Sequence, residues 1–140
     1  MTSLKSISLR SVNSSDFQFL YDLLKQRQSN ENISHKKMPT LTQHIKFVKS
    51  KPYFKWYIIL DDKSRLGSIY LSKQNEVGIF IDKNSRKIGI GNKSLELLIQ
   101  KNPRNRYLAN INPKNKKSIK FFTKNKFKLI QYTYELIPLK

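Results

Sequence analysis

Cysteine is absent from the 140 residues, and histidine occurs only at His35 and His44. The first absence excludes a disulfide scaffold, thiol catalysis and a cysteine-type zinc site, and the second argues against a histidine-rich metal site. We therefore expect no bound metal. Long apolar runs are also missing, and the first residues lack the apolar core of a secretion signal. A cytoplasmic protein without a membrane segment is expected.

Acidic residues are few, with 9 against 28 Lys and Arg, which gives a formal net charge of +19. Such a charge is typical of proteins that bind polyanions. Lys nevertheless outnumbers Arg 22 to 6 and is spread along the chain, whereas nucleic-acid readers favour the bidentate fork of Arg. We interpret the charge as a solvated basic surface that attracts acidic cofactors and substrates. A basic nucleic-acid-binding module without catalysis is the alternative from another class.

The length is that of one domain, residues 1–140, with no linker, repeat or low-complexity block. Hydrophobic periodicity predicts the order β-α-α-β-β-β-α-β-α-β-β. Antiparallel strands are expected over 53–60, 66–71 and 76–81, and a short strand over 107–111. Two last strands, 127–130 and 132–136, are expected to close the sheet. The predicted class is α/β, a mixed α+β sheet with helices on both faces.

Cap signals predict where helices begin. Ser14 or Ser15 is expected to cap the first helix, and Thr40 with Gln43 has the spacing of a capping box for the second. The last helix is expected to begin at Asn112, since the proline that follows it suits the first helical position.

Residues 79–99 form the most informative stretch, because they read as strand, basic glycine loop and helix. The first amide N–H groups of a helix lack intrahelical partners and carry partial positive charge. Gly89 and Gly91 permit a ligand to approach the main chain, and Arg86 and Lys87 add full charges. The loop is therefore expected to bind a pyrophosphate. Its spacing matches neither a Walker P-loop nor a dinucleotide fingerprint, and an ordinary conformational turn is the alternative.

This Arg-x-x-Gly-x-Gly pattern after an apolar strand resembles the acetyl-CoA pyrophosphate loop of the GCN5-related N-acetyltransferases, the GNAT superfamily. The element order resembles the GNAT fold over about residues 7–136. Residues 115–127 look like the family's Asn-x-x-Ala-x-x-Leu-Tyr-x-x-x-Gly-Phe helix and match it at Asn115 and Phe127. The resemblance implies a GNAT-like acyl-CoA N-acyltransferase fold, with a single acetyltransferase domain over 1–140.

Two positions depart from the family's helix motif. Phe122 stands where the family places the Tyr that protonates the leaving CoA thiolate, so solvent or another tyrosine, such as Tyr70 or Tyr107, is expected to do so. Lys126 replaces the Gly that follows the helix. Because Asn tolerates the left-handed conformation better than Lys, we expect the helix to end early, with Asn125 in that conformation.

The resemblance implies acetyl-CoA as cosubstrate, lying between the strand over 76–81 and that over 107–111. The backbone of Phe80 and Ile81 would pair with the pantetheine, the glycine loop would hold the pyrophosphate, and Asn115 would reach the thioester end. The implied cofactor-binding residues are Phe80, Ile81, Arg86, Lys87, Ile88, Gly89, Ile90, Gly91 and Asn115.

The implied reaction is direct attack of a substrate amine on the thioester, which calls for a base. Glu76 is the first choice, because burial beside Val77 and Ile79 is expected to raise its pKa toward neutrality. A hairpin-end carboxylate paired with a lysine is the structural alternative. His44 is the second choice, and a packed, hydrogen-bonded core histidine is its alternative.

A narrower resemblance concerns the acceptor. Arg27, the His44-x-x-Phe47 segment and the strand over 76–80 look like those of N-acetyltransferases that act on nucleotide-linked amino sugars, with the pseudaminic-acid pathway enzyme as the closest type. The expected function is acetyl transfer to the primary amine of a small acceptor such as a nucleotide-linked amino sugar. A protein or peptide amine acetyltransferase is the alternative. The expected partner is a small-molecule amine, not nucleic acid or a membrane, and the chain is expected to be a monomer or a homodimer.

Overall fold

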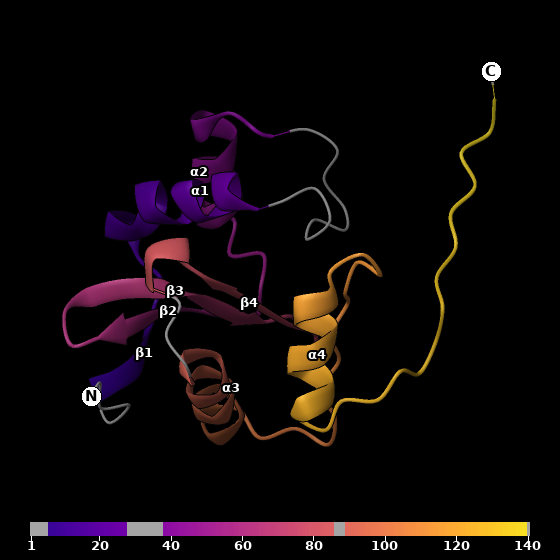
Figure 1. The fold of residues 1–140 in the computed structure, drawn as a ribbon. Helices are drawn as coiled ribbons and strands as arrows, with labels where there is room; N and C mark the ends of the chain where they lie inside the picture. The colour runs from indigo at the N-terminus through magenta and orange to yellow at the C-terminus, as the bar shows by residue number, and fades with distance from the viewer. Residues whose placement is uncertain (1–5, 28–37, 86–88, 140) are drawn as a thin grey trace.

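A central sheet separates two pairs of helices (Figure 1). The computed structural model describes residues 6–27, 38–85 and 89–139. Four antiparallel strands lie in the order β1 (Ile7–Ser11), β2 (Lys55–Asp61), β3 (Ser64–Leu71) and β4 (Val77–Ile81). One face is covered by α1 (Phe17–Gln26) and α2 (Leu41–Lys49), the other by α3 (Ile90–Lys101) and α4 (Lys116–Lys124). The predicted α/β class with helices on both faces is confirmed.

The central strand β2 is buried on both faces, as its apolar run predicts. Tyr57 and Ile59 belong to the core cluster that α3 and α4 share with the sheet. Ile58, which points to the opposite face, belongs to a smaller cluster with Leu20 and Val48 under α1 and α2. The sheet therefore has two separate cores, and its two faces can carry different tasks.

The predicted capping box of α2 is confirmed, since Thr40 accepts a hydrogen bond from the Gln43 N–H and Gln43 bonds back to Thr40. His44 is 6% exposed, so it lies within the buried stripe of α2. The last helix begins later than predicted. Its N-cap is Asn115, whose side chain accepts from the Ser118 N–H at 3.1 Å, whereas the Asn112 side chain accepts from the Lys114 N–H in a turn before the helix.

The cap at the start of the first helix also lies earlier than predicted, one residue before Ser14 and two before Ser15. Asn13 is the N-cap of a 3-10 turn, η2 (Ser14–Asp16), that leads directly into α1. Its side chain accepts from the Ser15 N–H, while the Asp16 carboxylate accepts from the Asn13 N–H. Asp16 completes this capping box from a position that is fully buried.

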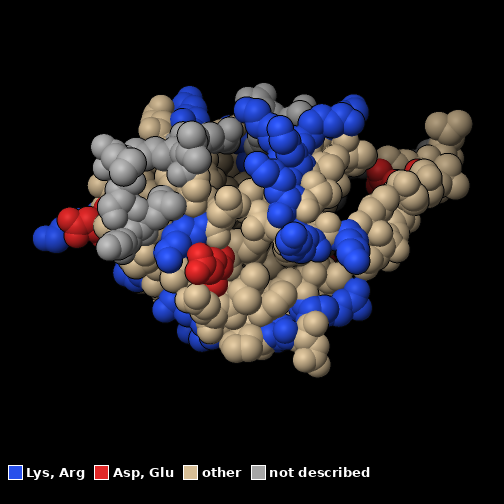
Figure 2. Space-filling model, turned by 60° about the horizontal axis from the view of Figure 1, so that its bottom comes forward, with Lys and Arg blue, Asp and Glu red and all other residues tan. Residues whose placement is uncertain are grey.

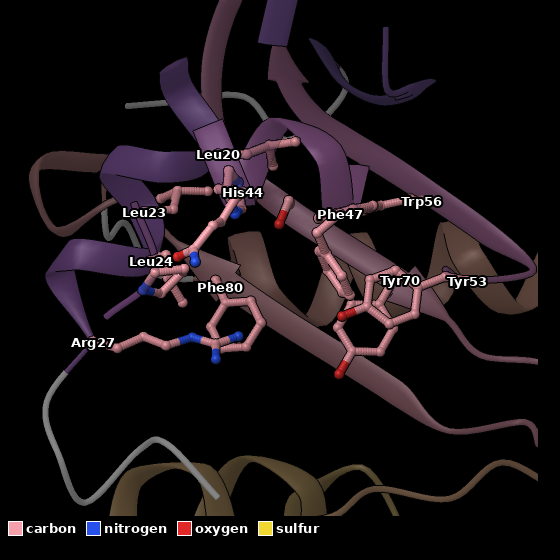
Figure 3. A pocket seen from close by; sticks show the side chains of 13 residues that line it. Leu20, Leu23, Leu24, Arg27, His44, Phe47, Tyr53, Trp56, Tyr70 and Phe80 are labelled. Atoms are coloured by element: carbon pink, nitrogen blue, oxygen red, sulfur yellow. The ribbon is translucent and has the colours of Figure 1, made fainter. Parts of the chain in front are cut away.

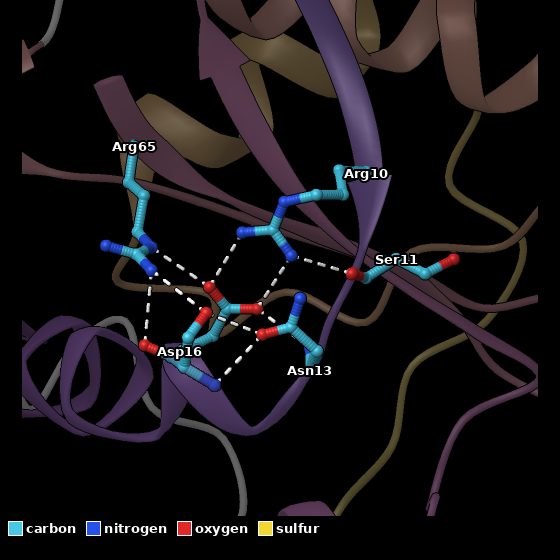
Figure 4. Close-up of polar contacts among 6 residues, drawn as sticks. Arg10, Ser11, Asn13, Asp16 and Arg65 are labelled. Carbon is cyan, nitrogen blue, oxygen red and sulfur yellow. Dashed lines mark hydrogen bonds and ion pairs between the residues drawn. The ribbon is translucent and has the colours of Figure 1, made fainter. Parts of the chain in front are cut away.

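Two arginines from the sheet compensate the buried charge of Asp16 (Figure 4). Arg10 of β1 donates to both carboxylate oxygens, at 2.8 and 3.0 Å, and Arg65 of β3 donates from Nε at 2.9 Å. Burial alone would raise the pKa of Asp16, but the hydrogen bonds from Arg10, Asn13 and Arg65 outweigh it and lower that pKa. This cluster ties the start of α1 to two strands.

The end of α4 differs from the prediction that Asn125 takes the left-handed conformation. Lys126 has φ of 74° and Asn125 has φ of −93°. The Phe127 N–H donates to the Phe122 carbonyl, and the Lys126 N–H donates to Thr123. These two bonds form a Schellman motif, which requires a left-handed residue at the position of Lys126. Their formation outweighs the local preference of Asn.

The predicted strands 127–130 and 132–136 do not form. Residues 128–139 instead extend away from the body as an exposed segment without regular structure. Only Gln131 separates the two predicted strands, whereas the shortest common hairpin loops have two residues, so no turn can join them. Residues 107–111 contribute a single parallel bridge, between Glu76 and Leu108, in place of a full strand.

Candidate active site

β4 and the segment 107–111 pair at one point only. The Val77 N–H donates to the Leu108 carbonyl at 2.7 Å, and the Leu108 N–H donates to the Asn75 carbonyl at 2.8 Å. Within the residues that the structure describes, no further backbone hydrogen bond joins β4 to 107–111. The two segments meet at one end of β4, and the remaining edge of β4 is not covered by 107–111.

The alternation of an antiparallel pair decides which main-chain groups face this edge. The Asp82 N–H donates to the Leu66 carbonyl, and the Phe80 carbonyl lies against Gly67, so these residues turn their main chain toward β3. Ile79 and Ile81 accordingly direct their N–H and C=O groups to the opposite edge. Phe80 and Ile81 were expected to pair with pantetheine, and of these two only Ile81 has this orientation. Ile79, which was not predicted, has the same orientation.

The glycine loop leads into α3 as predicted at the residues that can be described. Gly89 is the N-cap of α3 with φ of 90°, a conformation that residues with a Cβ rarely adopt. Ile90 is buried in the core. A Cβ at Gly91 would lie 2.9 Å from the Phe121 ring, so Gly91 allows α3 to approach α4. Arg86, Lys87 and Ile88 lie outside the described residues.

A cavity of about 180 Å³ opens on the other face of the sheet, between β2–β4 and the helices α1 and α2 (Figure 3). Its walls are mainly aromatic. They are formed by Phe47, Tyr53, Trp56, Tyr70 and Phe80, together with leucines of α1 and the polar residues Arg27, Gln43, His44 and Ser68.

Two stacked tyrosines form part of the cavity wall. The rings of Tyr53 and Tyr70 lie parallel, with centroids 3.8 Å apart. Tyr70 covers Gly78 of β4 so closely that a Cβ at Gly78 would lie 2.2 Å from its ring. A residue with a side chain would therefore not fit at position 78 under this ring. Burial raises the pKa of Tyr70, so its hydroxyl remains protonated at neutral pH.

Two buried nitrogen atoms on the cavity wall have no hydrogen-bond partner among the described residues: His44 Nε2 and Trp56 Nε1. Burial lowers the pKa of His44, and the charge of Arg27 lowers it further, so the imidazole is neutral at pH 7. The Arg27 guanidinium lies 3.5 Å from the centroid of the Phe80 ring. The cavity therefore combines apolar walls with hydrogen-bonding groups that a bound molecule could satisfy.

Glu76 lies at the point where β4 meets 107–111. Its two carboxylate oxygens accept hydrogen bonds from the Ser72 hydroxyl at 2.9 Å and from Asn110 Nδ2 at 2.6 Å. The alternative of a lysine-paired carboxylate finds no support, since no ion pair to Glu76 occurs in the described part of the chain. The charge of Glu76 acts on Tyr70 and contributes to raising its pKa. Glu76 thus lies near the part of the cavity that Tyr70 lines.

The chain matches the family model "Acetyltransferase (GNAT) domain" over residues 6–128. It belongs to the GNAT acetyltransferase family. A search of curated proteins found no significant match. Among solved structures it resembles an acetyltransferase from Thermus thermophilus, with 15% identity, TM-score 0.71 and coverage of 93% of this chain and 92% of that chain.

Two further similar structures are of enzymes whose activity is known by name. The alpha-N-protein acetyltransferase RimL in complex with coenzyme A has 18% identity, TM-score 0.72 and coverage of 91% of this chain and 82% of that chain. Apo FdhC, a nucleotide-linked sugar GNAT, has 18% identity, TM-score 0.70 and coverage of 92% and 82%. These similarities show the GNAT fold. The protein is an N-acetyltransferase, and its family uses acetyl-CoA.

This GNAT acetyltransferase differs from its family's helix motif in ways that the structure explains. Phe122 is 6% exposed and packs edge-on against Phe121 and Phe127, so it fills the core and has no hydroxyl to donate. The Tyr107 hydroxyl donates to the Asn102 carbonyl and accepts from a backbone N–H, which commits it to the loop after α3. Of the two tyrosines considered as proton donors, Tyr70 is the one in the cavity.

The predicted site residues fall into separate places in the GNAT acetyltransferase. Glu76 and Ile81 lie along β4, Gly89 and Gly91 lie at the start of α3, and His44 lies across the cavity on α2. The sequence did not predict that Tyr53 and Trp56 line the cavity. Tyr53 lies before β2, in the turn over 50–54, so the alternating pattern of a strand does not show which way its side chain points.

No group of His, Asp and Glu that could hold a metal ion occurs among the described residues, and no described helix could span a membrane.

Proposed function

We propose that this GNAT acetyltransferase transfers the acetyl group of acetyl-CoA to the primary amine of a small acceptor bound in the aromatic cavity. One observation carries the proposal: Tyr70 of the cavity wall lies above Gly78, beside the point where β4 and 107–111 stop pairing. An acceptor from the α1/α2 face and a thioester at the edge of β4 would meet there. The Tyr70 ring occupies the space that a side chain at Gly78 would fill, so the Tyr70 hydroxyl would lie near this meeting point.

The cosubstrate fits the edge of β4 on three grounds. Ile79 and Ile81 turn backbone groups toward that edge, which suits the amides of an extended pantetheine chain. Gly89 begins α3 in a left-handed conformation, and the first amide groups of α3 suit phosphate oxygens. Arg86, Lys87 and Ile88, between η3 (Lys83–Ser85) and α3, would contribute charge and backbone to the same loop. Ile90, Gly91 and Asn115 complete the proposed set, whereas the main chain of Phe80 faces β3 and is not available to the pantetheine.

Glu76 is the proposed base, with His44 as the second candidate. The Ser72 hydroxyl and the Asn110 amide hold the Glu76 carboxylate in one orientation at the meeting point. A base there can take the proton of the attacking amine, directly or through a water molecule. His44 is neutral, and its Nε2 has no hydrogen-bond partner among the described residues. It can therefore accept a hydrogen bond from an amine substrate deeper in the cavity.

Tyr70 is the proposed donor of a proton to the leaving thiolate. Its hydroxyl is protonated at neutral pH and lies close to Gly78. Phe122 and Tyr107 are unsuited to this step, because the first lacks a hydroxyl and the second uses its hydroxyl within a loop. No residue of the chain forms a covalent intermediate in this scheme, since the amine attacks the thioester directly.

A nucleotide-linked amino sugar is the proposed acceptor class. The positive charge of Arg27 at the cavity suits a diphosphate, and the aromatic walls suit a ring-shaped group. The fold likeness to FdhC is consistent with this choice, although RimL is as similar in identity. The limited cavity favours a small acceptor over a protein or peptide amine, which remains the second candidate.

A thiol-release assay tests the proposal. The full chain is supplied with acetyl-CoA and one of three acceptor groups: amino-sugar nucleotides, simple polyamines, or peptides with a free N-terminus. We expect the amino-sugar nucleotides to give the highest kcat/KM. Release with peptides alone would favour the protein-amine alternative. Binding of DNA in preference to acetyl-CoA at high salt would favour the nucleic-acid module, whose affinity should otherwise fall steeply with salt.

Replacement of Glu76 by Gln tests the base. We expect Glu76→Gln to keep its affinity for acetyl-CoA and to lose about 100-fold or more in kcat at neutral pH, since general-base catalysis contributes roughly 10²–10⁴. The loss should shrink at high pH, where more of the amine is neutral. A pH–rate profile measures this, with His44→Gln measured alongside. If Glu76→Gln has the same pH–rate profile as the parent, Glu76 is only a structural carboxylate. His44 then becomes the candidate for the base.

A further inference from the structure

Residues 128–139 form an extended segment that contacts little of its own molecule. Every residue from Lys128 onward in this segment is exposed. Figure 1 shows it leaving the end of α4 and running outward, separate from the sheet. Its large apolar side chains are 62–100% exposed: Leu129, Ile130, Tyr132, Tyr134, Leu136, Ile137 and Leu139. Monomeric proteins rarely leave so many neighbouring apolar side chains in water.

The segment has the alternation of a strand with one buried face. Ile130, Tyr132, Tyr134 and Leu136 fall on one side, and Gln131, Thr133 and Glu135 fall on the other. The rings of Tyr132 and Tyr134 lie 6.4 Å apart at an interplanar angle of 27°, which agrees with a shared side. A strand of this pattern is stable when one face packs on a core and its backbone pairs with a sheet edge.

The described part of the chain also has a sheet edge without a backbone partner. Leu108 directs both its N–H and its C=O to the chain around β4, so Tyr107 and Ala109 direct theirs to the other side. No backbone hydrogen bond to Tyr107, Ala109 or Ile111 occurs among the described residues. The side chains of these three residues pack against the core shared with α3. Another strand could add here and extend that core.

We propose that residues 128–139 pair with the edge formed by residues 107–111 of a second copy of this chain, and that the exchange is reciprocal. Within the described residues, the chain thus supplies both an exposed segment with the pattern of a strand and an edge without a backbone partner, which is the self-complementary arrangement of a two-fold dimer. Ile130, Tyr132, Tyr134 and Leu136 continue the partner's core, while Gln131, Thr133 and Glu135 face solvent.

The charge of the segment favours a second copy as the occupant. Two molecules that each carry a net charge of +19 repel one another. The segment holds one Lys and one Glu, so its net charge is zero, and it can approach the partner without that repulsion. Figure 2 shows the far part of the segment projecting on the right, in tan and red. No turn interrupts the segment, which agrees with one long exchanged strand.

The exchange also bears on the proposed cosubstrate site. Residues 107–111 form the side of the site opposite β4, and only the pairing around Glu76 and Leu108 anchors them to the sheet. A strand from the partner would fix this side from outside. Dimer formation is therefore expected to lower KM for acetyl-CoA as well as to bury the apolar segment.

Sedimentation equilibrium with two matched variants tests the proposal. Tyr134→Lys places a charge on the apolar face, and Thr133→Lys places the same charge on the polar face one residue away. We expect the parent and Thr133→Lys to sediment at twice the chain mass, and Tyr134→Lys to dissociate at least 10-fold more readily. Dimerisation of the parent should strengthen with salt, because salt screens the repulsion. A monomeric parent, or equal dissociation of both variants, would overturn the proposal.

Cysteine mixing distinguishes exchange from folding back within one chain. The absence of cysteine leaves only the engineered thiols to react. One protein carries Leu108→Cys, and its partner carries Gln131→Cys or Thr133→Cys, since these positions share the face opposite the core. We expect oxidation of the mixture to give a disulfide-linked pair of different chains. A chain that carries both cysteines and links only to itself would overturn the proposal, even where its fold is intact by circular dichroism.

Discussion

Single residues fix the backbone around the site for different physical reasons. Gly89 has a positive φ that a Cβ makes costly, and Gly78 lies under the ring of Tyr70. Lys126 also has a positive φ, although it carries a long side chain. The first two are glycines because the site needs them, whereas the third retains strain that a glycine would relieve.

Gly89→Val is expected to weaken binding of acetyl-CoA at least 10-fold, because the Cβ both strains the turn and obstructs a phosphate at the helix start. Asp62→Val is the matched control. Asp62 has φ of 58° in the turn between β2 and β3, so its substitution carries a similar strain outside the proposed site. Isothermal titration beside thermal melts measures both. If Gly89→Val and Asp62→Val lose the same stability and Gly89→Val keeps the parent's affinity for acetyl-CoA, Gly89 has no role in binding the phosphate.

Lys126→Gly is expected to stabilise the protein by about 1 kcal/mol, since the left-handed conformation costs a residue with a Cβ roughly 1–2 kcal/mol and glycine regains part of this after its own entropy loss. Lys120→Gly, at an exposed position inside α4, should instead destabilise by about 1 kcal/mol. Urea denaturation monitored by circular dichroism gives both values. Destabilisation by glycine at both positions would mean that Lys126 makes a compensating contact.

At the scale of elements, the predictions that held are those in which local pattern and tertiary packing agree. The apolar run over 53–60 predicted the central strand, and Thr40 with Gln43 predicted the start of α2. The failures lie where a neighbour decides. Asn13 caps the first turn because Asp16 returns a bond to it, and the Schellman bonds override the preference of Asn125. These contacts span only three to five residues, but several capping patterns fit the same stretch, and the sequence does not decide which of them forms.

The predicted site divides in the same way. The glycine motif placed Gly89 at a helix start because its chemistry is local to the chain. The aromatic cavity could not be predicted, since Tyr53 and Tyr70 come from separate segments and meet only through the register of β2 and β3. A one-residue slip of that register would turn Tyr70 to the opposite face.

Asp16 joins elements, so its replacement is expected to loosen α1 from the sheet. Asp16→Asn leaves Arg10 and Arg65 without a charge partner and should cost about 2–3 kcal/mol. The pKa of Asp16 is lower in the folded than in the unfolded chain, so its contribution is present above the unfolded pKa, near 4, and is lost as pH falls through the folded pKa. The difference between parent and Asp16→Asn should therefore be largest at neutral pH and shrink in acid.

Thermal melts from pH 7 to pH 3 measure this dependence, and Asp22→Asn serves as control. Asp22 accepts a hydrogen bond from Gln18 on the exposed side of α1, so its removal should change stability by less than about 0.5 kcal/mol. A constant difference between parent and Asp16→Asn across this pH range would show that geometry, not charge, accounts for the stabilisation.

At the scale of the whole molecule, the positive charge is arranged as several patches on the face shown in Figure 2. One of them belongs to α4, whose exposed residues include Lys116, Lys117, Lys120 and Lys124. Gly91 packs on Phe121, and Asn92 accepts a hydrogen bond from Asn125, so this end of α4 lies beside the start of α3. A phosphate-bearing cosubstrate at α3 would therefore lie in the field of these lysines.

Lys124→Glu is expected to raise KM for acetyl-CoA roughly 5-fold at low salt, because reversing one charge near a multiply charged ligand changes its binding free energy by about 1 kcal/mol. Lys49→Glu is the control, since Lys49 lies in the last turn of α2 on the opposite side of the sheet. The two variants have the same net charge, so they separate the local field of α4 from the overall charge. Above about 0.5 M salt, where the Debye length is only a few ångströms, KM of Lys124→Glu should return to that of the parent. Equal increases in both variants would assign the effect to net charge alone, and α4 would then have no particular part in attracting the cosubstrate.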